Sequence, residues 1–167
     1  MDIRMNIMLS VAEVTEETQE QARRIVCAGL EERFGELDPS YNKDLDDIVS
    51  WYAGQGHLFL TGALEGQMVC TGALIREGRD VGRIARMSVW KPYRRRGIAR
   101  CMLLELERRA RHMGYAKLVL ETTASWLDAV QFYKANGYVE VERDEEEVYL
   151  EKVLYSRDKR LQWKKLC

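Results

Sequence analysis

Hydrophobic residues along the chain alternate between helical and strand spacings. In residues 98–113 they recur every three or four positions, as on one face of an amphipathic helix, and Gly114 follows as a helix-ending glycine. Residues 81–89 are expected to form a buried strand just before this helix, and no Asp or Glu occurs from 81 to 104. We therefore expect a strand, a basic turn and a long helix at the centre of the fold.

The remaining periodicities predict the other elements and their order. Strands are predicted at 7–14, 57–64, 67–75, 117–121, 138–143 and 147–154, and helices at 15–35, 42–54 and 125–137. Thr15 and Ser125 are expected to cap the first and last of these helices. Asp44 and Glu107 are expected on outer, solvated helix faces. The order strand, helix, strand across 81–121 predicts a right-handed crossover between parallel neighbours.

Length and composition narrow the class of protein. The span 1–167 is expected to be one domain, with 155–167 as a C-terminal tail. A net charge of -1 argues against a general polyanion binder. The 4 cysteines lack CxxC spacing and the 2 histidines are isolated from them, so neither a disulfide framework nor a metal site is expected. No apolar run suits a signal peptide or a membrane span, which makes a reducing, cytoplasmic location the expectation.

A basic turn precedes the long helix and predicts an anion site. Three arginines at 94–96 are followed by Gly97 at the expected helix start. A helix N-terminus presents unpaired backbone N–H groups and the positive end of the helix dipole to an anion. Gly97 and Ala99 keep side chains away from that backbone, and the arginines add forked donors. The pattern favours a phosphate-bearing cofactor, and the alternative is a solvated helix start.

The motif Arg-x-x-Gly-x-Ala at 94–99 resembles the acyl-CoA pyrophosphate loop of the GNAT N-acetyltransferase superfamily. A second motif, Ala-x-x-Phe-Tyr-x-x-x-Gly-Tyr at 129–138, lies at the distance that the family needs, and the resemblance extends over residues 58–154. It implies an α/β fold of the α+β type, with a mixed, mainly antiparallel twisted sheet of about seven strands and about four helices. The central parallel strand pair would splay apart at the cofactor site. The resemblance also implies acetyl-CoA as acyl donor, with no metal.

The resemblance assigns roles to particular residues. The implied cofactor-binding residues are Met87, Ser88, Val89, Arg94, Arg95, Arg96, Gly97, Ile98, Ala99, Arg100 and Trp126. The backbone of 87–89 would pair with the pantetheine arm, and the N–H groups of 95–100 would hold the pyrophosphate. Tyr133 matches the family tyrosine that serves as general acid for the CoA thiolate. At position 126 many members carry Asn, so that contact would be lost or replaced by Ser125 or the Trp126 indole.

The general base and the acceptor are less constrained. Glu121 is a candidate base, and Glu77 or Asp80 could act at the end of a water chain. In the resembled fold the segments 16–47 and 140–147 border the acceptor, and here both are rich in carboxylates. Such a field favours a cationic primary amine, such as a polyamine, an aminoglycoside-like compound or a lysine-rich peptide. Ordinary solvated faces are the alternative.

Two other functions agree with parts of the sequence. A non-catalytic acyl-CoA-binding sensor of the same fold would use the loop but not Tyr133. A nucleic-acid-binding domain could use the basic stretch 94–111, but Glu105 and Glu107 on that helix and the near-zero net charge argue against it. We therefore expect an acetyl-CoA-dependent N-acetyltransferase with a small-molecule or peptide amine acceptor. No nucleic acid or membrane partner is expected, and a homodimer is left open.

Overall fold

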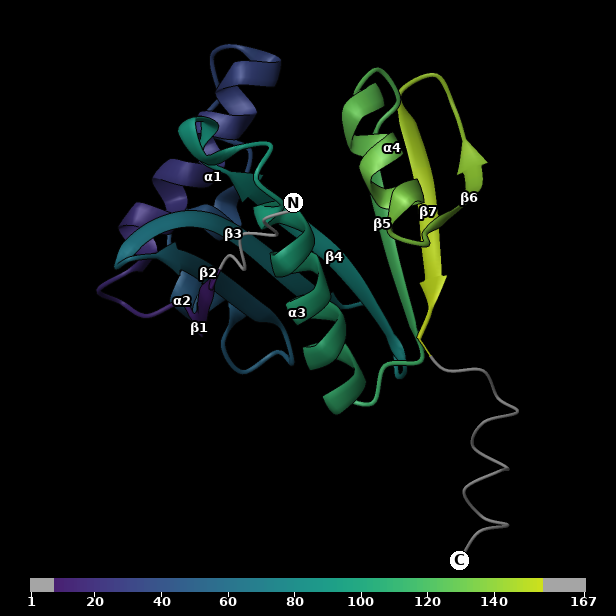
Figure 1. Ribbon diagram of the computed structural model, residues 1–167, viewed down its shortest axis with the longest axis horizontal. Helices are drawn as coiled ribbons and strands as arrows, with labels where there is room; N and C mark the ends of the chain where they lie inside the picture. Colours follow the sequence, from purple (N-terminus) through teal and green to yellow (C-terminus); the bar gives the residue numbers. More distant parts are fainter. Residues whose placement is uncertain (1–7, 155–167) are drawn as a thin grey trace, which may run out of the picture. The chain divides into compact units, whose positions relative to one another are not determined.

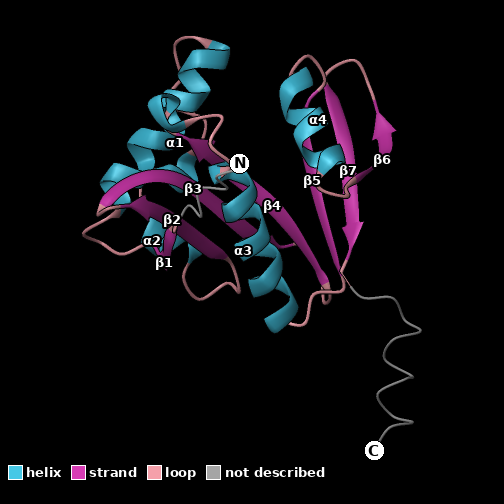
Figure 2. Cartoon of the chain, viewed as in Figure 1, coloured by secondary structure: helices cyan, strands magenta, loops and turns pink. Residues whose placement is uncertain are grey.

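Seven strands form one sheet in the order β1-β2-β3-β4-β5-β7-β6 (Figure 1). The computed structural model describes residues 8–154. The strands are β1 (Ser10–Glu13), β2 (Leu58–Leu64), β3 (Gln67–Arg76), β4 (Val81–Val89), β5 (Lys117–Thr123), β6 (Val139–Arg143) and β7 (Glu147–Val153). The α-helices are α1 (Gln19–Phe34), α2 (Ile48–Tyr52), α3 (Ile98–His112) and α4 (Leu127–Ala135), and the short 3-10 turns are η1 (Lys43–Leu45) and η2 (Lys91–Tyr93) (Figure 2).

The strand directions confirm the expected fold class. The pairs β1-β2, β2-β3, β5-β7 and β6-β7 are antiparallel, whereas β4 and β5 are parallel. The parallel ladder joins Val81 to Lys117 and ends with Arg83 opposite Val119. The fold is thus a mixed, mainly antiparallel sheet with a parallel pair, while the splaying of that pair stays a prediction.

Contacts along the chain divide it into two compact units. One holds the described residues up to Ile75 together with Ala85–Leu106, and the other holds Arg76–Ile84 and the described residues from Glu107 onward. β4 and α3 contribute residues to both. The expectation of a single domain stays a prediction, and the predicted tail 155–167 lies outside the described residues. Within residues 8–154, no helix combines the length and the apolar character needed to cross a membrane.

In the first unit, helices cover both faces of the strands. The Ser88 hydroxyl of β4 donates to the carbonyl O of Ile25 in α1 at 3.1 Å. The neighbouring Met87 faces the other way, because a Cβ at Gly72 would lie 3.0 Å from the Met87 sulfur and 2.8 Å from Met102 in α3. One hydrophobic core cluster joins α1, η1 and α2 to β2 and β3 through Ala22, Ile25, Val26, Leu45, Ile48, Tyr52, Phe59, Met68 and Ala73.

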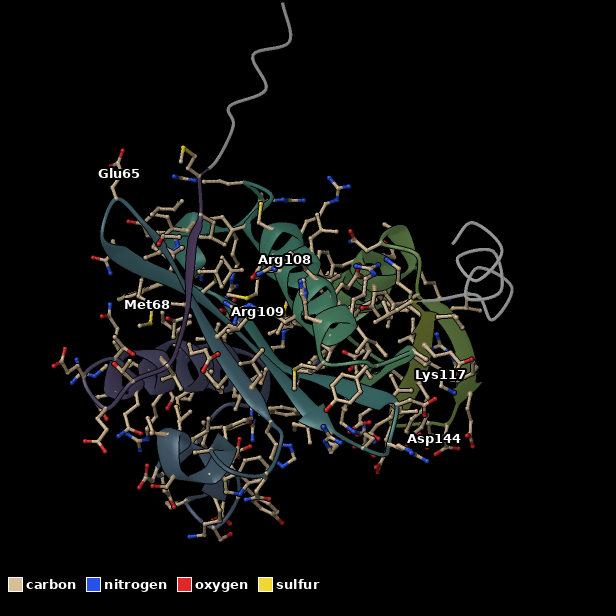
Figure 3. The ribbon with its side chains drawn as sticks, turned by 90° about the horizontal axis from the view of Figure 1, so that it is seen from below. Glu65, Met68, Arg108, Arg109, Lys117 and Asp144 are labelled. Atoms are coloured by element: carbon tan, nitrogen blue, oxygen red, sulfur yellow. The ribbon has the colours of Figure 1, made fainter. Side chains whose placement is uncertain are left out.

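In the second unit, α4 lies alongside β5 and β7 (Figure 1). Buried side chains of this unit include Tyr115, Leu118, Leu120, Val148 and Leu150. Asp144 begins the exposed β6–β7 turn, where its Oδ1 accepts from the N–H groups of Glu146 and Glu147 at 2.8 and 2.7 Å (Figure 3). The predicted turn between the last two strands is therefore present and is stabilised by its own aspartate.

Two predictions near the N-terminal half are wrong. Thr15 is not the N-cap residue of α1, because the helix starts at Gln19 with Thr18 at its N-cap position. The predicted continuous helix at 42–54 is replaced by η1 and the short α2. Asn42 has a left-handed φ of 59°, which an α-helix does not tolerate.

Three further predictions are wrong, the first because of local geometry and the other two because of tertiary contacts. Ser125 does not cap α4, because Trp126 takes the N-cap position without a side-chain cap hydrogen bond, and its N–H donates to the Thr123 carbonyl at 2.9 Å. Asp44 and Glu107 are not on solvated faces: they are 8% and 1% exposed. Each accepts hydrogen bonds from buried or half-buried partners, and a buried carboxylate requires such partners.

Candidate active site

A left-handed residue interrupts β4 just before the predicted pantetheine-binding segment 87–89. Arg86 has φ 52°, and its carbonyl accepts from the buried hydroxyl of Thr71 at 2.8 Å. A non-glycine residue in this conformation is uncommon in a strand and is typical of a bulge that redirects the side chains after it. The kink therefore sets the direction in which the 87–89 backbone continues.

The Arg86 side chain is held in a buried charge cluster. Its Nε and Nη2 donate to the two Asp44 carboxylate oxygens at 2.9 and 2.6 Å, and its Nη1 donates to Asn42 Oδ1 at 3.1 Å. The Tyr52 hydroxyl donates to Asp44 Oδ2 at 2.9 Å. Burial, followed by the charge of Asp44, raises the pKa of the Tyr52 phenol. These hydrogen bonds connect the η1 segment to the kink in β4.

The loop between η2 and α3 has an open backbone. Arg95 and Gly97 take left-handed conformations with φ of 61° and 79°, and a Cβ added at Gly97 would meet nothing within 4 Å. The buried Ile98 anchors the start of α3. The Cys101 N–H donates to the Gly97 carbonyl at 3.1 Å, and the N–H groups before it have no partner inside the helix by α-helical geometry. These groups and the exposed arginines around them can bind an anion.

The first arginine of the loop is bonded to protein groups. The Arg94 guanidinium donates to Glu32 Oε1 at 2.9 Å and lies 2.8 Å from Glu32 Oε2, while its Nε donates to the Val89 carbonyl at 3.0 Å. The hydrogen bond from Arg94 is the main cause of a lowered pKa of Glu32. The guanidinium of Arg96 lies over the Tyr93 ring at 5.3 Å. Arg94 thus connects α1 to the end of β4, a contact that local sequence does not indicate.

In the second unit, Tyr133 lies on α4 among other aromatic rings. It is 8% exposed, and its ring centroid is 5.1 Å from that of Phe132 and 5.6 Å from that of Tyr138, both edge-on. Burial raises the pKa of the Tyr133 phenol. A phenol is protonated at neutral pH even without this shift, so the hydroxyl is available as a proton donor.

Two of the candidate bases share one arginine. Arg83 of β4 forms ion pairs with Glu121 of β5 and with Glu77. The hydrogen bond from Arg83 lowers the pKa of Glu77, which weakens that carboxylate as a base. The third candidate, Asp80, uses its backbone carbonyl to accept from the Ala116 N–H at 2.7 Å.

The predicted site residues are divided between the units. Residues 87–89 and 94–100 belong to the first unit, whereas Glu121, Trp126 and Tyr133 belong to the second. Sequence reasoning missed Arg86, although a signal was present. Arg86 stands two positions after the apolar Ile84, so strand alternation places a charged side chain on the face that buries Ile84. Among residues 8–154, no group of His, Cys, Asp and Glu side chains is arranged to hold a metal ion.

The chain is similar in sequence to several known proteins. The sequence model of the Acetyltransferase (GNAT) family matches residues 18–138. The chain is 28% identical over 102 residues to the uncharacterized N-acetyltransferase YjgM of Escherichia coli K12, covering 59% of this chain and 61% of the relative. It is 33% identical over 107 residues to the N-acetylaspartate synthetase of Xenopus tropicalis, covering 63% of this chain and 40% of the relative. The chain therefore spans less than two thirds of the length of these relatives.

A solved structure shares the fold. The PaiA N-acetyltransferase of Thermoplasma acidophilum, determined in complex with coenzyme A, superposes with a TM-score of 0.75 at 18% sequence identity. The match covers 87% of this chain and 99% of that protein. At this level of identity the likeness concerns the arrangement of helices and strands.

Proposed function

Since the chain belongs to the Acetyltransferase (GNAT) family, we propose that it transfers an acetyl group from acetyl-CoA to an amine acceptor. The observation that carries the proposal is the loop before α3. Its backbone takes two left-handed conformations at Arg95 and Gly97, and no side chain stands within 4 Å of where a Gly97 Cβ would be. Exposed guanidinium groups surround this open backbone at the N-terminus of a 15-residue helix. Such an arrangement fits the pyrophosphate of CoA.

The chain's own residues supply binding and orientation. The backbone of 87–89 binds the pantetheine arm, and the N–H groups of 95–100 hold the pyrophosphate. The side chains of Met87 and Ser88 are already packed against α3 and α1, which fixes the path of the backbone between them. Trp126, at the N-cap of α4, replaces the asparagine common in the family as a cofactor contact.

The reaction proceeds by direct attack. The amine nitrogen bonds to the thioester carbonyl carbon, the C–S bond breaks, and the departing thiolate takes the phenol proton of Tyr133. The proton lost by the amine passes to a base, for which Glu121 is the candidate. Glu121 and Glu77 both form an ion pair with Arg83, so the structure does not rank one above the other as the base.

For the acceptor, we propose a cationic amine. The carboxylates of 16–47 and 140–147 support this, but fewer of them contribute a net field than the sequence suggests. Several lie within ion-pair distance of a cationic side chain, namely Glu20, Glu32, Asp44, Asp46 and Glu140. The name of the Xenopus relative specifies N-acetylaspartate, which makes aspartate the competing acceptor class.

Binding and turnover test the proposal separately. Calorimetric titration with acetyl-CoA is expected to show one site, and no binding would remove the cofactor assignment. Release of free CoA thiol is then measured with spermidine, a lysyl peptide, aspartate, glutamate and a neutral arylamine at low and high salt. Salt-dependent turnover of the cationic members supports the proposal. Preference for aspartate would overturn the acceptor class, and binding without any turnover would indicate an acyl-CoA sensor.

A further inference from the structure

A buried ion pair in the second unit joins α3 to β7. Glu107 is 1% exposed, and the Lys152 ammonium donates to its two carboxylate oxygens at 3.0 and 3.1 Å. The Tyr138 hydroxyl also donates to Glu107 Oε1, at 3.2 Å. A buried ion pair is often no more stabilising than apolar residues of the same size, because both charges lose their hydration. Its presence is better explained by the third partner of the lysine.

That third partner is the end of α4. Lys152 Nζ donates to the carbonyl O of Asn136, the C-cap residue, at 2.9 Å. The lysine stem runs beside Gly137, where a Cβ would lie 3.4 Å from Lys152 Cε. Asn136 in turn donates through its Nδ2 to the Phe132 carbonyl at 2.8 Å. A cation at this position satisfies a terminal carbonyl and complements the negative end of the helix dipole.

Residues of the same turn also contact Tyr133. The Tyr133 carbonyl accepts from the N–H groups of Asn136 and Tyr138 at 3.0 and 3.1 Å, and the Tyr138 ring lies edge-on to the Tyr133 ring. Glu107 therefore reaches Tyr133 by two routes. One passes through Lys152 and the helix end, and the other passes through the hydroxyl-anchored ring of Tyr138.

We propose that Glu107 and Lys152 are positioning residues, which hold the C-terminal turn of α4 and the Tyr138 ring so that the Tyr133 phenol keeps one orientation. The proposal deepens the function given above and rests on the role of Tyr133 as general acid. The pair itself does not touch the acetyl donor. It acts through Asn136 and Tyr138, and its loss loosens the orientation of the phenol.

A double-mutant cycle on kcat tests this role. Lys152→Met is expected to lower kcat roughly 10- to 100-fold, the effect of misplacing a catalytic group by a fraction of its size. In a Tyr133→Phe background the same substitution is expected to change kcat less than about 2-fold, because the group it positions is gone. An equal loss in both backgrounds would overturn the proposal, since a general disturbance of the fold does not depend on Tyr133.

Two control variants distinguish a loss of Tyr133 orientation from a general loss of stability. Lys117→Met removes another ion pair of the same unit, in which Lys117 Nζ lies 3.0 Å from Glu151 (Figure 3). This pair is more exposed, because the side chain of Lys117 is 38% exposed against 23% for Lys152. Lys117→Met is expected to leave kcat unchanged, and Lys152→Arg is expected to restore most of the activity lost in Lys152→Met. If Lys152→Met does not fold, the double variant Glu107→Gln with Lys152→Met removes both charges together and takes its place.

A measurement that does not depend on turnover tests the positioning role even if Tyr133 is not the general acid. In protein labelled with 3-fluorotyrosine, the Tyr133 fluorine resonance is assigned by its absence from Tyr133→Phe. Its shift or linewidth is expected to change in Lys152→Met and not in Lys117→Met. An unchanged resonance overturns the positioning role whatever the activity. Wild-type turnover in Tyr133→Phe would overturn the general-acid assignment alone.

Discussion

Arg86 and Asp44 form a bidentate ion pair between residues 42 positions apart in the chain, with bonds of 2.9 and 2.6 Å. The pair lies in the first unit and connects the η1 segment to the kink in β4. Arg86 is the left-handed residue of that kink, so its side chain and its backbone are constrained at once. The path of the predicted cofactor strand thus depends on a carboxylate that the helical pattern assigned to the surface.

Breaking this pair is expected to destabilise the protein strongly. Arg86→Met leaves the Asp44 carboxylate buried without its cation and should lower the free energy of unfolding by about 3–5 kcal/mol in urea denaturation. Lys43→Met is the control, because it removes an exposed pair with Asp46 at 3.9 Å and should change stability by less than about 0.5 kcal/mol. A loss below about 1 kcal/mol in Arg86→Met would show that Asp44 is solvated after all.

Gly97→Glu is expected to abolish acetyl-CoA binding in calorimetry. The substitution adds bulk and negative charge where the pyrophosphate would approach the backbone. Gly97→Ala separates this effect from backbone strain, since Gly97 has φ 79° but open space around it, and should retain measurable binding. Gly78→Glu adds the same charge to another open turn and should bind as wild type. Wild-type affinity in Gly97→Glu would rule out this loop as the phosphate site.

Substitution of Glu32 distinguishes two roles of Arg94, because each role changes the acetyl-CoA affinity in the opposite direction. If Arg94 holds the loop in place through Glu32, then Glu32→Gln should weaken acetyl-CoA binding by about 2- to 5-fold, the range expected of a partly exposed pair. The variant carrying both Glu32→Gln and Arg94→Gln should be no worse than Arg94→Gln. If Arg94 instead contacts phosphate directly, Glu32→Gln frees the arginine and tightens binding.

Tyr133→Phe is expected to lower kcat about 10²-fold or more while the affinity for acetyl-CoA stays within about 2-fold of wild type. The phenol hydroxyl is lost, but the ring that packs against Phe132 and Tyr138 remains. Tyr149→Phe removes another hydroxyl of the second unit, which donates to Glu147 at 2.9 Å, and should leave turnover unchanged. Equal rates in wild type and Tyr133→Phe would assign the proton to water.

The reactivity of Cys70 is expected to depend on opening of the fold. Burial raises the pKa of the Cys70 thiol from 9.0 to about 12. Below pH 9 the thiolate fraction is therefore smaller in the folded protein than in the unfolded chain. Iodoacetamide labelling at pH 8, followed by peptide mass mapping, should modify Cys70 more than about 10-fold more slowly in buffer than in urea. Comparable rates would show that the thiol is accessible.

The order of elements could be predicted because it depends on local patterns. The strand at 81–89 agrees with β4 to the residue, and the helix at 98–113 differs from α3 by one residue at its end. The glycines at 97 and 114 both have positive φ, as their places at the start and end of this helix suggested. Hydrophobic period and glycine placement report backbone conformation within a few residues, and this information does not need the rest of the chain.

The partners of charged side chains could not be predicted in the same way. Periodicity contained a hint for Glu107, which stands four residues after Leu103 and three before Ala110 on the apolar face of α3. It contained none for Lys152, which is 45 positions away. A glutamate on an apolar face can bend to solvent or bind a cation, and only the packed structure decides between them.

The sequence by itself therefore determined the fold class, the open glycine turn at the start of α3 and the place of Tyr133 on α4, since each follows from local conformational preference or from a motif. Tertiary structure alone decided which charges meet. Arg94 binds Glu32 across 62 positions, Arg86 binds Asp44, and Lys152 binds Glu107. The physical reason is that an ion pair depends on the three-dimensional path of two distant segments and on the water that each loses, neither of which is encoded in the neighbourhood of either residue.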